Sequence, residues 1–131
     1  MKNLLSVIAS ALLLQGILLA QEKPAGSQGL KVEKIVVATS VDNRDPVGEN
    51  TEFEASVGTV SCWTKVTASN PPATIKHVWY SGDKKVFEQP LEIKSPSTRT
   101  WSTKTVRAGS WKVDVTDDSG AVLSSVSFTV K

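Results

Sequence analysis

From residue 30 to the end of the chain, apolar and polar residues alternate with a period of two. Side chains that share one face of a β-strand have this spacing, whereas a helix repeats every 3.6 residues. The pattern predicts strands over residues 31–39, 59–67, 75–80, 98–106, 110–116 and 121–130. Residues 84–87 and 91–93 form either one strand interrupted at Pro90 or two short strands. No stretch after residue 20 carries an apolar stripe at helical spacing.

Turn-forming residues separate these segments. Residues 42–50 read as a polar loop, Pro71 and Pro72 break the chain after the strand at 59–67, and Gly120 suits a hairpin turn. Short strands at intervals of about 8–12 residues are typical of sandwiches and barrels. We therefore predict an all-β protein, an immunoglobulin-like antiparallel β-sandwich of two sheets with 7–8 short strands, because each one-sided sheet must bury its apolar face. A barrel is the structural alternative.

The first 20 residues have the pattern of a secretory signal peptide. Lys2 precedes an apolar run from Leu4 to Leu14, and Ala20 precedes a polar break. A membrane anchor is the alternative, but a span needs about 20 apolar residues and Gln15 interrupts this run.

This reading divides the chain into three parts. We predict a signal peptide at 1–20 cleaved after Ala20, a flexible spacer at 21–29, and a single β-sandwich domain at 30–131. The expected location is the periplasm or the outside of the cell, with no membrane attachment after cleavage.

Charge and cysteine content narrow the classes of partner that we expect. The chain has 15 basic and 13 acidic side chains, which gives no electrostatic reason to expect nucleic acid as a partner. Its one cysteine, Cys62, shares a strand face with Val60, Thr64 and Val66. We expect an inert core thiol, with a reactive or dimerising thiol as the alternative, and a monomer or weak oligomer.

Three ordered motifs carry a family resemblance. They are His77-Val78-Trp79-Tyr80-Ser81-Gly82-Asp83-Lys84, Arg99-Thr100-Trp101-Ser102-Thr103-Lys104 and Gly109-Ser110-Trp111-Lys112-Val113. With the loop at 42–46, they resemble the bacterial domain-of-unknown-function family numbered 2914, over about residues 32–131. The chain departs from the family at Thr98, where Trp is frequent, and at Asp83, which lengthens a turn. The resemblance implies a non-enzymatic extracytoplasmic β-domain and no established activity.

Few side chains are candidates for catalysis or metal binding. His77 is the only histidine, and no nucleophile, orienting acid or set of metal ligands accompanies it in the motif. We therefore predict no catalytic site, no metal and no cofactor. His77 is expected to be a packed residue bonded to a neighbouring strand, or alternatively a polar anchor in a binding groove. Arg99 and Trp101 point the same way on their strand, so the guanidinium can stack on the ring.

These residues define the predicted binding surface: His77, Trp79, Tyr80, Arg99, Trp101 and Lys104. The favoured function is a non-catalytic extracytoplasmic binding module for a glycan, a peptide or another protein of the cell envelope. A purely structural or assembly domain, with every aromatic ring in the core, is the alternative, and a hydrolase comes last. The exposure of Trp79 and Trp101 separates the first two.

Overall fold

The computed structural model describes residues 29–131. The predicted signal peptide and nearly all of the predicted spacer lie outside these residues. The elements are β2 (Leu30–Asp42), β3 (Asp45–Glu49), β4 (Glu52–Phe53), a 3-10 turn η4 (Ala55–Val57), β5 (Thr59–Ala68), β6 (Ala73–Ser81), β7 (Lys84–Ile93), β8 (Ser97–Thr105), β9 (Gly109–Asp117) and β10 (Val122–Val130). Within the described part of the chain, no helix is long and apolar enough to cross a membrane.

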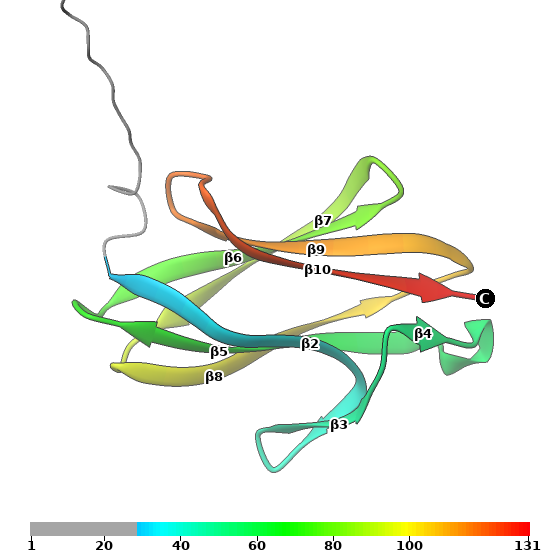
Figure 1. Ribbon diagram of the computed structural model, residues 1–131, viewed down its shortest axis with the longest axis horizontal. Helices are drawn as coiled ribbons and strands as arrows, with labels where there is room; N and C mark the ends of the chain where they lie inside the picture. The colour runs from blue at the N-terminus through cyan, green and yellow to red at the C-terminus, as the bar shows by residue number, and fades with distance from the viewer. Residues whose placement is uncertain (1–28) are drawn as a thin grey trace, which may run out of the picture.

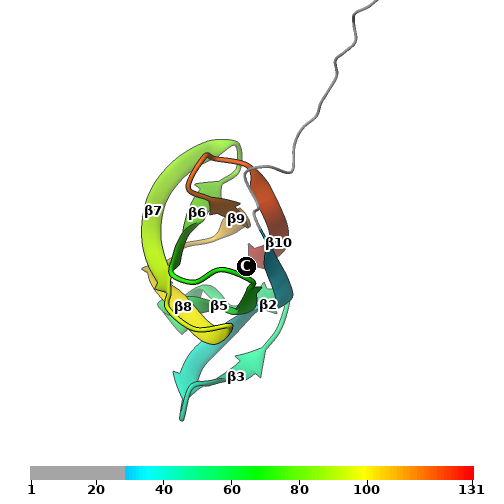
Figure 2. The same ribbon diagram turned by 90° about the vertical axis from the view of Figure 1, so that its left-hand side faces the viewer.

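Two open sheets pack face to face (Figures 1 and 2). One has the strand order β4-β10-β9-β6-β7 and the other β3-β2-β5-β8. In immunoglobulin terms, β2, β5 and β8 take the places of strands A, B and E, while β6, β9 and β10 take those of C, F and G. The short β4 pairs with β10 in parallel, and every other pairing is antiparallel. The predicted immunoglobulin-like sandwich is confirmed.

The predicted loop at 42–50 is wrong, because β2 and β3 form a hairpin there. At its turn, Asn43 and Arg44 have φ of 54° and 67°, as a two-residue type I′ turn requires. The strand escaped prediction because β3 lies at a sheet edge with both faces largely exposed, so no apolar alternation marks it.

Strand β7 runs unbroken through Pro90. It is an edge strand that pairs only with β6 in residues 29–131. A proline on such a strand costs no ladder bond when its missing N–H would have faced away from the neighbour. The interruption suggested by Pro90 is therefore absent.

The core lies between the sheets and is rich in aromatic rings. Phe128 stacks on Trp111 with ring centroids 6.0 Å apart, and its ring meets those of Phe53 and Trp79 edge to face. Cys62 is buried in the same cluster, as predicted. A buried ring of this size hides about 150–250 Å² from water, worth on the order of 4–6 kcal/mol by area. The aromatic cluster is therefore a main source of stability.

Candidate functional site

The structure distributes the six predicted binding residues over different surfaces. His77 and Trp79 point inward from β6 and are fully buried. Tyr80 follows the inward-facing Trp79 on β6 and therefore points outward, where its ring lies 4.8 Å from Lys112 Nζ. Lys104 lies where β7 and β8 meet, with its Nζ 6.0 Å from the Phe87 ring. Only Arg99 and Trp101 share an accessible face, so the expectation of one surface carrying all six is wrong.

His77 and Trp79 belong to a polar network between the sheets. Thr64 Oγ1 donates to the carbonyl of Thr100 at 3.1 Å, and it lies 3.2 Å from His77 Nε2. Ser102 Oγ lies 2.7 Å from His77 Nδ1 and accepts a bond from Trp79 Nε1 at 3.0 Å. The network therefore joins β6 to both β5 and β8.

The bonds determine the position of the imidazole proton. Thr64 has one hydroxyl hydrogen and gives it to a carbonyl, so it can only accept from His77 Nε2. Nε2 is then the protonated nitrogen, and Nδ1 accepts from Ser102. Burial lowers the pKa of His77 to about 4, which keeps the ring neutral at ordinary pH. His77 thus has every bond of a neutral imidazole satisfied, and it lies away from solvent.

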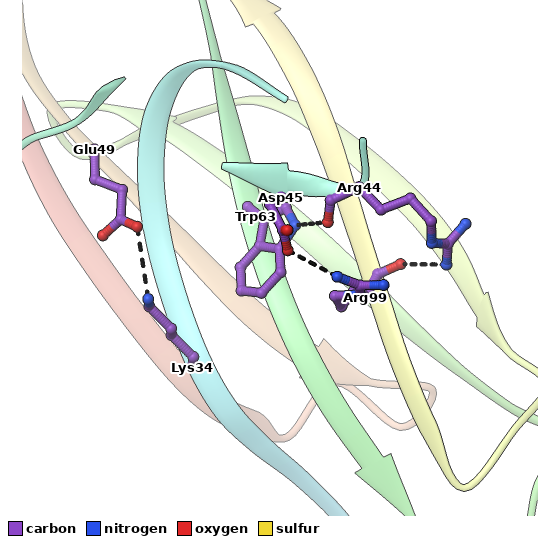
Figure 3. A network of polar contacts seen from close by, with 6 residues as sticks. All are labelled: Lys34, Arg44, Asp45, Glu49, Trp63 and Arg99. Atoms are coloured by element: carbon purple, nitrogen blue, oxygen red, sulfur yellow. Dashed lines mark hydrogen bonds and ion pairs between the residues drawn. The ribbon is translucent and has the colours of Figure 1, made fainter. Parts of the chain in front are cut away.

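The outer face of the four-stranded sheet carries a tryptophan pair. Trp63 on β5 lies opposite Trp101 on β8, and both point away from the core. Trp63 is nevertheless only 4% exposed, because the β2–β3 hairpin folds over it and the Arg44 carbonyl accepts its Nε1–H at 3.0 Å (Figure 3). Trp101 remains partly exposed beside it.

Polar contacts hold the hairpin to this face. Arg99 Nη1 lies 2.7 Å from Asp45 Oδ1, and Arg44 Nη2 donates to the Arg99 carbonyl at 3.4 Å (Figure 3). Lys34 and Glu49 pair at 3.5 Å across β2 and β3. Exposed ion pairs are each worth about 0–1 kcal/mol, so it is their combination with the bond from Trp63 that orients the hairpin.

Sequence reasoning missed Trp63, Arg44 and Asp45 as members of this site. One signal was available, since Trp63 has the outward parity of a strand whose inward positions are Cys62 and Thr64. A large ring on an outer face is buried only if another segment packs over it. The polar sequence of residues 42–50 gave no indication that this segment packs over Trp63.

Other reactive groups offer no site within residues 29–131. Burial raises the pKa of the Cys62 thiol, so it stays protonated and unreactive. No three His, Cys, Asp or Glu side chains of the described chain are grouped as a metal would need.

Asp117 Oδ1 accepts from the Ser119 hydroxyl and from two backbone amides in the β9–β10 turn. Burial opposes ionisation of Asp117, but these bonds outweigh it and lower the pKa.

The fold and this face together define an immunoglobulin-like domain with an aromatic–cationic surface that the β2–β3 hairpin holds in place. Residues 72–130 match the family described as "Protein of unknown function (DUF2914)". The predicted resemblance is thereby confirmed over β6 to β10, which contain all three motifs. The β2–β3 hairpin precedes the matched residues. A search of the curated proteins finds no match.

Proposed function

We propose that this domain is a non-catalytic binding module that acts outside the cytoplasm. Its contact surface is the outer face of the four-stranded sheet, with Trp101 at its centre. Around Trp101 lie Arg99 and Thr103 on β8, Lys65 on β5 and the hairpin residue Arg44. The ligand classes that suit such a surface are a glycan, a peptide or another protein of the cell envelope.

The observation that carries the proposal is the partial exposure of Trp101 on a rigid support. Its neighbour Trp63 is buried and hydrogen-bonded, so the surface beneath the ligand is fixed before binding. A tryptophan supplies a large contact area for the loss of few torsional freedoms. Lys65 and Arg99 lie opposite each other on the paired strands and add donors for hydroxyl, carbonyl or carboxylate groups.

The extracytoplasmic location is supported by the signal-like pattern of residues 1–20. The absence of catalysis is supported by the burial of the two residues most suited to chemistry, His77 and Cys62, and by the neutral, fully bonded state of the imidazole. A reacting group must reach its substrate, and neither side chain does.

A purely structural role is the second candidate. It is favoured by the burial of three of the four tryptophans, Trp63, Trp79 and Trp111. On that reading, Trp101 is only a surface residue of a sheet that supports a larger assembly.

Binding to a glycan array and to an envelope extract, compared between Trp101→Ala and Tyr80→Ala, distinguishes the two roles. Tyr80 is the matched control, because it is a partly exposed aromatic residue on the outer face of the other sheet. We expect Trp101→Ala to lose binding at least tenfold while Tyr80→Ala retains it, with both variants folded by circular dichroism. Equal binding by both variants would contradict the proposed surface.

A further inference from the structure

Strand β8 leaves one side of its backbone unpaired. In residues 29–131 it is hydrogen-bonded to β5 alone, and it forms the end of the four-stranded sheet (Figures 1 and 2). The strand has nine residues and no proline. An edge of this kind can pair with an additional strand.

The register shows which residues face this free edge. The ladder with β5 is continued at its ends by bonds from Ala68 N to Pro96 O and from Val106 N to Gly58 O. In an antiparallel pair, residues alternate between facing the neighbour and facing away. The even-numbered residues of β8 therefore face β5, and the backbone groups of Arg99, Trp101, Thr103 and Thr105 face outward.

Two cationic side chains cover the ends of the free edge. Arg44 donates to the carbonyl of Arg99 at 3.4 Å, and Lys104 Nζ donates to that of Thr105 at 3.3 Å. Between them, the backbone groups of Trp101 and Thr103 have no strand beside them in the described chain. Both covering bonds are long and exposed to solvent, so an incoming strand can displace them at small cost.

The opposite sheet ends in an edge that is protected in another way. Strand β7 carries Pro90, and its exposed residues include Glu88 and Glu92. The proline removes an N–H that an added strand would need, and the glutamates would repel an acidic strand. The two long edges of the sandwich therefore differ, and β8 is the one that accepts a strand.

Charge selects the partner. The side chains that lie on or beside the free edge of β8 are mostly cationic: Arg44, Lys65, Arg99 and Lys104, against Asp45, which pairs with Arg99. Pairing of two β8 edges from two copies would bring these cations together, whereas an acidic segment would neutralise them.

From this edge and its charge, we infer that β8 binds an extended acidic peptide segment of a partner protein as an added strand. The inference rests on the proposed binding function and specifies its ligand. Alternate side chains of the added strand would lie beside Arg99 and Trp101 on the outer face, so one ligand would use both the edge and the aromatic surface.

The test uses a fluorescein-labelled peptide of alternating Val and Glu, nine residues long to match β8, with fluorescence anisotropy on the full-length protein. A peptide with Lys in place of Glu is the charge control. Thr103→Pro removes an edge-facing N–H, and Glu92→Pro makes the matched change on the β7 edge. Two further peptides carry N-methyl groups on alternate amides, one phase on the odd-numbered residues and the other on the even-numbered residues. Only the phase whose methylated amides face β8 blocks pairing, and neither changes a side chain.

We expect the unaltered protein to bind the Glu peptide and to bind the Lys peptide at least tenfold more weakly. Thr103→Pro should lose at least tenfold in affinity for the Glu peptide, whereas Glu92→Pro should not. One N-methylated phase should lose binding and the other keep it. This arm uses the unaltered protein, so it decides the matter even if Thr103→Pro fails to fold.

Three results would overturn the inference. Binding of both N-methylated phases, with loss in Trp101→Ala, would keep the proposed surface and reject strand addition. A dimer in sedimentation that Thr103→Pro abolishes would make the occupant a second copy. No binding of the Glu peptide alongside Trp101-dependent binding of a glycan would also reject the acidic strand and leave the proposed function standing.

Discussion

At the residue scale, Ser102 is the centre of the buried polar network. One hydroxyl donates to His77 Nδ1 and accepts from Trp79 Nε1, so two buried groups depend on it. A buried donor or acceptor left without a partner costs about 1–3 kcal/mol. The serine therefore matters more for stability than its size suggests.

Replacing Ser102 with alanine should lower the free energy of unfolding by about 2–4 kcal/mol, because His77 Nδ1 and Trp79 Nε1 both lose their hydrogen-bond partner. The measurement is denaturant unfolding, with Ser127→Ala as the control, since Ser127 is exposed on the outer face of β10. The control should change stability by less than about 0.5 kcal/mol. A similar stability for the two variants would show that the network contributes little.

At the element scale, the β2–β3 hairpin is positioned by a residue on another strand. The hydrogen bond from Trp63 Nε1 to the Arg44 carbonyl joins β5 to a turn whose two central residues both have positive φ. For a side chain such as that of Arg44, this backbone conformation costs on the order of 1 kcal/mol, so the contact has to stabilise it.

Trp63→Phe removes the donor and keeps most of the ring. We expect amide hydrogen exchange over residues 45–49 to accelerate about fivefold, the equivalent of roughly 1 kcal/mol, while exchange in β9 is unchanged. Trp101→Phe on the paired strand serves as the matched control. Unaltered exchange in the hairpin of Trp63→Phe would mean that its ion pairs suffice to hold it.

At the scale of the whole molecule, the neutral His77 makes folding depend on pH. Its pKa is about 4 in the folded protein and about 6.5 when solvated, so the unfolded chain binds more protons between these values. The contribution is fully present above pH 6.5 and is lost as the pH falls toward 4. Asp117 acts in the same direction at lower pH, because its folded pKa is also lowered.

Unfolding free energies measured between pH 7 and pH 4 should therefore decrease by about 3 kcal/mol, roughly 2 kcal/mol of it by pH 5. His77→Gln supplies the control, since glutamine does not titrate. An equally steep decrease in the glutamine variant would assign the pH dependence to other groups.

The sequence by itself determined the strands and the sandwich. The period of two is a local property of the chain, so it identified β5, β6, β8, β9 and β10 within a few residues, and it placed Ile75, His77 and Trp79 on one shared face. The turn residues and the need to bury one-sided sheets then left few architectures. The three motifs pointed to the family that matches residues 72–130.

Tertiary structure alone decided which of these positions are reachable by a ligand. Parity along a strand assigns a face but not what covers that face. Trp63 points outward and is buried by the hairpin, whereas Trp101, directly opposite, stays partly exposed. His77 looked like a possible anchor until Thr64 and Ser102, distant in sequence, enclosed it between the sheets. Contacts between strands far apart along the chain set accessibility, and no local pattern encodes them.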